Sequence, residues 1–206
     1  MIANFDRDGT SDEGAPGYAF IWGRLINQVA ERLDGYKAYT KHNIIREFPQ
    51  FNTAFLAAYR MSALGIALPN IGDSGATGSV GSGISPQFIA RGYALSRNPD
   101  LARAAYHANK NSANGLAQDI YSSDPDAISK EIKQIAENSG GRPEGGYLMS
   151  GFGLALLESG TGASGSALAN NYGRTMKHAH PDLLNFDLLA FGSWLAPDHG
   201  YPEFAT

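Results

Sequence analysis

A change of pattern near residue 140 constrains the fold of this chain more than any other feature. Before the segment Ser139-Gly140-Gly141-Arg142-Pro143, apolar residues recur at helical spacing, and after it the chain consists of short apolar runs separated by Gly and Ser. A helical stripe can pack against other helices, whereas a short strand must pair with other strands. The sequence therefore predicts an α-helical domain at 1–140 and an antiparallel β-domain at 141–206.

Six segments of the first part have a helical pattern. In the first, Tyr18 to Leu33, apolar residues form one stripe, and Pro16 suits a helix start. The stripe consists of Phe20, Ile21, Leu25, Ile26, Val29 and Leu33. The other predicted helices are Asn43–Phe48, Asn52–Leu64, Pro86–Ser96, Pro99 to about Gly115, and Asp126–Asn138.

The second part contains three apolar runs, at 151–159, 166–178 and 183–196, divided by Gly and Ser turns. Runs of this kind are typical of antiparallel strands, and we expect the last to include one strand from Leu184 to Trp194. Three or so strands would leave one sheet face uncovered. We therefore expect the chain to end inside its β-domain.

Composition and charge exclude several classes of function. The net charge is −4 and the chain has no basic run, which argues against a nucleic-acid surface. The absence of cysteine excludes disulfides and thiolate metal sites. No apolar run reaches transmembrane length, and the first twenty residues lack the pattern of a signal peptide. We expect no nucleic-acid partner and no membrane span.

Three of the five histidines lie in the stretch from Lys177 to Tyr201. In an extended chain His178 and His180 would point to the same side, roughly 6–7 Å apart. A hairpin could bring the Asp198 carboxylate back beside His180, and imidazole with carboxylate is a common donor set for zinc. A third ligand would still be needed. The residues alone leave open whether this is a metal site or a hydrogen-bonded surface cluster.

A Gly- and Ser-rich segment, Leu68 to Ser85, separates two predicted helices. It resembles a phosphate-binding loop only superficially, because it lacks the Gly-Lys-Ser/Thr ending and a preceding strand. It could be a flexible linker or a structured loop at the edge of a site. Its acidic residue, Asp73, has no assigned role at this stage.

Two sets of residues resemble the heparinase II/III-like polysaccharide lyases. The segment from Tyr147 to Tyr201 resembles the start of their β-domain, with Tyr-Gly, His-x-His-x-Asp, a hydrophobic strand and Asp-x-Gly-Tyr in that order. These motifs are Tyr172-Gly173, His178-Ala179-His180-Pro181-Asp182, Leu183 to Trp194, and Asp198-His199-Gly200-Tyr201. His199 departs from the family, which usually has Pro or Ser there, and could perturb the turn.

The N-terminal segment resembles the family's Asp-Gly…Glu-Gly-x-x-Tyr motif, here from Asp8 to Tyr18. The resemblance implies the C-terminal part of an (α/α) toroid followed by the first antiparallel strands of a β-sandwich. It covers nearly the whole chain but only the middle of the family's length. We therefore expect activity in a longer parent protein, with little in this chain alone. A periplasmic or secreted location and a homodimeric parent are further implications.

Such lyases cleave uronic-acid polysaccharides, alginate or glycosaminoglycans among them, by β-elimination. The site must neutralise the carboxylate, remove the C5 proton and protonate the leaving O4. By resemblance, Tyr18 is the base and acid, and His178 assists it in the cleft. A free tyrosine titrates near pH 10, so as a base it needs help from nearby groups. Packing of Tyr18 on Trp22 is the structural alternative.

By the same resemblance, His180 and Asp198 hold a structural zinc whose third ligand lies outside this chain. Two other hypotheses stay open. One is a metal-dependent hydrolase that uses His178, His180 and Asp198 around an activated water. The other is a non-catalytic carbohydrate-binding fragment. The sequence does not identify which acidic polysaccharide would be the substrate.

Overall fold

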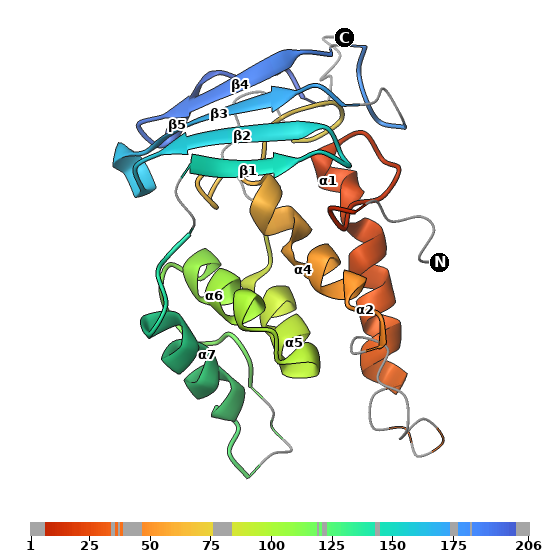
Figure 1. Cartoon of the computed structure of the whole chain (residues 1–206), viewed down its shortest axis with the longest axis vertical. Helices are drawn as coiled ribbons and strands as arrows, with labels where there is room; N and C mark the ends of the chain where they lie inside the picture. The colour runs from red at the N-terminus through yellow and green to blue at the C-terminus, as the bar shows by residue number, and fades with distance from the viewer. Residues whose placement is uncertain are drawn as a thin grey trace, which may run out of the picture.

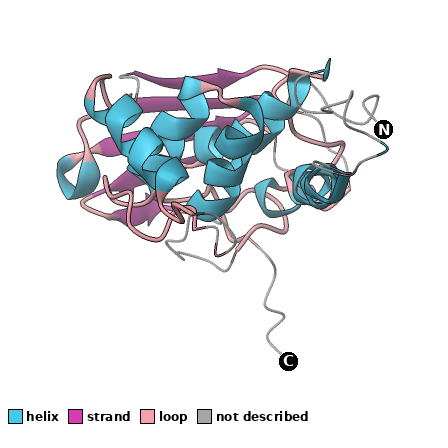
Figure 2. Cartoon of the chain, turned by 90° about the horizontal axis from the view of Figure 1, so that it is seen from below, coloured by secondary structure: helices cyan, strands magenta, loops and turns pink. Residues whose placement is uncertain are grey.

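The computed structural model describes residues 7–33, 36, 38, 47–75, 84–118, 120, 123–142, 145–173, 177–181 and 183–200. The chain forms a layer of helices and a five-stranded antiparallel sheet. Figure 1 shows the sheet above the helices, with α1 and α2 at one end and α6 and α7 at the other. The view from below shows the helices over one face of the sheet (Figure 2).

Most predicted helices are present, with different ends. The described helices are α1 (Pro16–Ala19), α2 (Ile21–Leu33), α4 (Gln50–Met61), α5 (Pro86–Ser96), α6 (Pro99–Ala108) and α7 (Ala127–Glu137). The first predicted helix is interrupted at Phe20, and the helix predicted to reach Gly115 ends at Ala108. There Asn109 donates hydrogen bonds to the carbonyls of Ser112 and Asn114, which turns the chain away.

The predicted helix at Asn43–Phe48 lies mostly outside the described residues. Within the described part of the chain, no helix is long and apolar enough to cross a membrane.

The apolar stripe of α2 does not face the core as a whole. Ile26 is buried, but Leu25 and Val29 are 44% and 53% exposed, and Trp22 is exposed as well. The helix turns Gly23 toward α4, where a Cβ atom would lie in ordinary contact, 3.4 Å from the Ala54 side chain. Part of the apolar stripe of α2 therefore remains at the surface.

The antiparallel sheet has the strand order β1-β2-β3-β4-β5, so every strand pairs with its neighbour in the sequence. The strands are β1 (Gly145–Met149), β2 (Leu154–Ser159), β3 (Ser166–Asn171), β4 (Asn185–Ala190) and β5 (Ser193–Ala196). The single strand predicted up to Trp194 is wrong. It is a hairpin, because Phe191 and Gly192 both have positive φ and form a tight turn.

Two apolar clusters form the core. One lies among the helices, around Phe55, Ile89 and Leu101. The second joins the segment after α4 to the inner sheet face, with Leu64 and Leu156 among its buried residues. The change from helix to strand falls between Glu137 and Gly145, as predicted. Because the second cluster contains residues from both sides of this boundary, the two parts share a core, and their division into separate domains stays a prediction.

The outer sheet face is apolar and open to solvent. Leu148 pairs in register with Ala155, and Leu157 with Leu168, so these side chains share one face. Leu148 and Leu157 are exposed, as are Phe186 and Leu195. This is the uncovered face that the small number of strands predicts.

A buried ion pair fastens the helices to one end of the sheet. The Arg142 guanidinium binds both carboxylate oxygens of Glu158 at 2.8 Å and donates to the carbonyls of Tyr59 and Ser62. Burial alone would lower the pKa of Arg142, but its bonds to Glu158 raise it above the usual range. The guanidinium lies over the rings of Tyr59 and Tyr147. The carboxylate, the two carbonyls and the two rings together fix the position of the Arg142 guanidinium.

Candidate functional site

Three segments that are far apart in the sequence meet at the start of α1. They are the acidic segment at 8–18, which runs into α1, the loop at 69–75 and the histidine segment at 177–180. The amide of Gly14 donates to the carbonyl of Lys177 at 2.7 Å, and the amide of Asp73 donates to the carbonyl of His178 at 2.9 Å. The amide of Gly17 donates to Ser74 Oγ at 2.7 Å. Backbone bonds therefore fix the histidine segment between the other two segments.

Two glycines permit this close approach. A Cβ on Gly72 would lie 2.4 Å from the carbonyl oxygen of His178, and Gly72 has a positive φ of 58°. A Cβ on Gly14 would lie 2.5 Å from the Ala179 side chain. Any larger residue at either position would push the loops apart.

The structure brings Tyr18 and His178 together. Their rings stack with centroids 4.0 Å apart and an angle of 1° between the planes. His178 has a φ of 59°, in the left-handed region that costs a residue other than glycine on the order of 1–3 kcal/mol. The hydrogen bond from Asp73 to the His178 carbonyl helps to hold this conformation. The packing of Tyr18 on Trp22, expected as an alternative, is not among the ring contacts of the described residues.

Glu13 fixes the orientation of the His178 ring. Its Oε2 lies 2.6 Å from His178 Nδ1, and the two side chains are 15% and 40% exposed. An ionised carboxylate can only accept hydrogen bonds, so Nδ1 carries the proton of this contact. Within the described residues Nε2 has no partner, and this nitrogen is the one available to a bound molecule. Beside this pair, Lys177 and Asp12 form an exposed ion pair at 3.5 Å.

His180 and Asp198, the predicted zinc ligands, have different partners. His180 Nε2 lies 3.1 Å from Asp73 Oδ1. The buried Asp198 carboxylate accepts from Asn185 and from the amide of Gly200. In the described residues no group of three His, Cys, Asp or Glu side chains is arranged to hold a metal. The residues present therefore do not complete a zinc site, and zinc binding stays a prediction.

The fully buried Asp187 on β4 anchors the 69–75 segment and the chain that follows β5. Its two carboxylate oxygens accept from the amides of Asn70 and Asp198. At the other side of the site, Asp8 accepts from the amides of Gly151 and Phe152 in the turn between β1 and β2. These carboxylates pair with backbone amides, so their role is to position the loops.

Sequence reasoning named Tyr18 and His178 but did not assign Glu13 or Asp73. In the sequence Glu13 is one residue of the N-terminal motif, and Asp73 is an acidic residue in a Gly-rich segment. A carboxylate gives no periodic signal, so the sequence does not indicate which histidine it meets.

Comparison with known proteins gives a likeness of fold. No model of a known protein family matches the sequence, and no curated protein matches it. Two structures of a heparinase III gene product, one of them with methylated lysines, match this structure with TM-scores of 0.51 and 0.58. The chain shares its fold with part of heparinase III. Each match has 14% sequence identity and covers 99% of this chain but 27% of the heparinase III chain.

Proposed function

We propose that the protein containing this chain is a polysaccharide lyase that cleaves uronic-acid-containing polysaccharides by β-elimination. The observation that carries the proposal is the stacked pair of Tyr18 and His178, with the His178 ring held by Glu13. The likeness of the fold to part of heparinase III supports it. The helical layer would then belong to an α/α toroid and the sheet to a β-sandwich, in a periplasmic or secreted enzyme.

The residues divide the chemistry between them. In the elimination the C5 proton leaves with a base, the C4–O4 bond breaks, a C4–C5 double bond forms and O4 receives a proton. The phenolic oxygen of Tyr18 would take the C5 proton and supply a proton to O4. His178 would present Nε2 to the substrate, since its Nδ1 is bound by Glu13. Positioning by Glu13 removes the need to orient the ring during turnover.

A structural zinc on His180 and Asp198 remains part of the proposal. The zinc would stiffen the histidine segment, because His180 lies two residues from His178. The pairing of His180 with Asp73 shows that this imidazole already has a carboxylate neighbour. The metal-dependent hydrolase has no specific support, since the described residues contain no three-donor group.

The Tyr18→Phe variant tests the function. The gene product that contains this chain, expressed at full length, is assayed with alginate, heparan-type and other uronate polysaccharides for an unsaturated product that absorbs in the ultraviolet. The unsubstituted protein should form this product, and Tyr18→Phe should lower turnover at least about a hundredfold because it removes only the phenolic oxygen. Tyr106→Phe on α6 is the matched control and should leave turnover unchanged. Normal turnover by Tyr18→Phe would show that the wrong tyrosine is named.

A further inference from the structure

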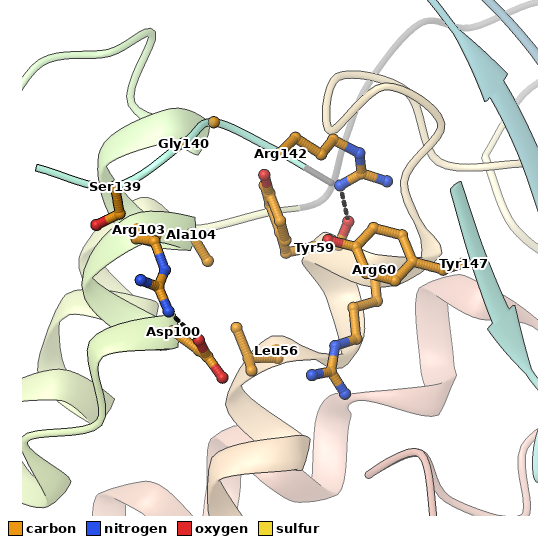
Figure 3. Close-up of a pocket in the computed structure, with 11 residues that line it drawn as sticks. Leu56, Tyr59, Arg60, Asp100, Arg103, Ala104, Ser139, Gly140, Arg142 and Tyr147 are labelled. Carbon is orange, nitrogen blue, oxygen red and sulfur yellow. Dashed lines mark hydrogen bonds and ion pairs between the residues drawn. The ribbon is translucent and has the colours of Figure 1, made fainter. Parts of the chain in front are cut away.

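A pocket of about 400 Å³ lies where α4, α6, the segment before β1 and β1 itself meet. Figure 3 shows Arg103 on one side of it and Arg60, Tyr59 and Tyr147 on the other. Arg142 and Asp100 also line it. None of its lining residues belongs to the three segments around Tyr18 and His178, so it is a separate site.

The pocket carries a positive charge that the protein does not neutralise. Arg142 is fully engaged by Glu158 and by backbone carbonyls. Arg103 pairs with Asp100 at 2.5 Å, but this pair is exposed, so water screens it. Arg60 forms no ion pair in the described residues. One of the three guanidinium groups therefore remains without a counter-charge.

Two tyrosines, Tyr59 and Tyr147, complete the lining of the pocket. The Arg142 guanidinium lies 4.7 Å from the centre of the Tyr59 ring and 4.6 Å from that of Tyr147, which holds both rings in place. Burial raises the pKa of the Tyr147 hydroxyl, while the charges of Arg142 and Arg60 act in the opposite direction. The Tyr147 hydroxyl therefore stays protonated at neutral pH and can donate a hydrogen bond.

We propose that this pocket binds the carboxylate or sulfate group of an acidic sugar residue, with Arg60 and Arg103 as the cations. Planar guanidinium groups match both oxyanions in geometry and charge. The partly exposed Tyr147 offers its hydroxyl and ring edge to the sugar that bears the group, while the buried Tyr59 supports it from behind. The choice of a sugar as the bearer rests on the proposed function, whereas the positive pocket does not. The pocket would hold a part of the polysaccharide away from the reacting bond.

Binding without turnover tests the pocket. In the Tyr18→Phe background, a sulfated uronate disaccharide is titrated by calorimetry at low salt. Arg60→Ala and Arg103→Ala should each weaken binding about tenfold, because each removes a charge-assisted hydrogen bond. Arg32→Ala is the control, since Arg32 also lies in the last turn of a helix but outside the pocket. The affinity of the Arg32→Ala variant for the disaccharide should be unchanged.

Three results would overturn the proposal. One is an unchanged affinity in Arg60→Ala and Arg103→Ala, with thermal unfolding that shows both proteins folded. Another is equal affinity for an uncharged disaccharide, which would exclude recognition of the anion. The third is inorganic sulfate binding as tightly as the disaccharide, which would exclude the sugar. Failure of the lyase assay together with Arg60-dependent binding would overturn the proposed function and support the pocket.

Discussion

Two acid–base pairs lie at opposite ends of the contact between the helices and the sheet, and they differ mainly in their access to water. Arg142 and Glu158 are 6% and 4% exposed, and their polar atoms bind one another and the backbone. His178 and Glu13 are 40% and 15% exposed, and His178 Nε2 has no partner in the described residues. The buried pair can contribute to stability but is inaccessible to a substrate. The exposed pair contributes little to stability and can take part in chemistry.

The largest expected effect comes from breaking the buried pair. Arg142→Met leaves the Glu158 carboxylate buried, with the Leu64 amide as its remaining partner in the part of the chain that the structure describes. We expect the free energy of unfolding to fall by about 3–5 kcal/mol, measured by urea denaturation. The double variant Arg142→Met/Glu158→Leu should regain much of this loss, because no charge is then left unpaired.

A surface pair serves as the control for this measurement. Lys133→Ala removes an exposed pair with Glu137 on α7 and should change the free energy of unfolding by less than about 0.5 kcal/mol. A loss below about 1 kcal/mol in Arg142→Met would contradict the stabilising role of the buried pair.

The exposed pair should affect turnover and leave stability nearly unchanged. Glu13→Gln keeps the shape of the side chain but no longer requires a proton on His178 Nδ1. We expect kcat to fall on the order of a hundredfold in the ultraviolet assay, while the urea midpoint stays within error. Asp12→Asn, at the neighbouring exposed pair with Lys177, is the matched control and should retain full turnover. Equal effects of the two substitutions would remove the specific role of Glu13.

A zinc ion bound at His180 would add rigidity to the segment that carries the exposed His178–Glu13 pair. We expect weak zinc binding by this chain, and His180→Ala should lower it by about tenfold or more. Metal analysis after dialysis against a fixed zinc concentration measures the change. Tight stoichiometric zinc that His180→Ala does not affect would contradict the assignment of this ligand.

Smaller effects concern pH at the buried end. His107 Nδ1 lies 3.0 Å from the Tyr59 hydroxyl, and burial, followed by the charge of Arg142, lowers the pKa of His107. The unfolded chain therefore takes up a proton before the folded chain does, so stability should be lost as the pH falls below about 6.5. His107→Asn should remove part of this slope in urea unfolding between pH 5 and 7.5. An unchanged slope would mean that His107 is not its source.

At alkaline pH the opposite sign applies. Burial raises the pKa of Tyr59 to about 12. The unfolded chain loses this proton first, near pH 10, so stability should fall as the pH rises from about 10 toward 12. Tyr59→Phe should reduce that fall, and unfolding at pH 9 and 11 measures it. If Tyr59→Phe and the unsubstituted protein lose the same free energy of unfolding between pH 9 and 11, the raised pKa of Tyr59 is not the cause of the alkaline loss.

Much of the fold follows from local pattern. The helices over Pro86–Ser96 and Ala127–Glu137 and the strand runs after the glycines agree with the sequence, because periodicity and turn residues act within a few residues of chain. The hairpin at Phe191-Gly192 was missed, because a continuous apolar run hides a two-residue turn. Leu25 and Val29 belong to the predicted stripe of α2 but are exposed, since periodicity cannot show which side of a wide stripe meets a neighbour.

The sequence by itself determined the helix-to-strand boundary and the antiparallel pairing, and its motifs singled out Tyr18 and His178. Only the tertiary structure decided that Glu13 binds His178, that Asp73 binds His180 and that Arg142 meets Glu158. The physical reason is range. A helix or hairpin forms through contacts between near neighbours, whereas a carboxylate pairs with whatever cation or amide the packed core brings within about 3 Å of it.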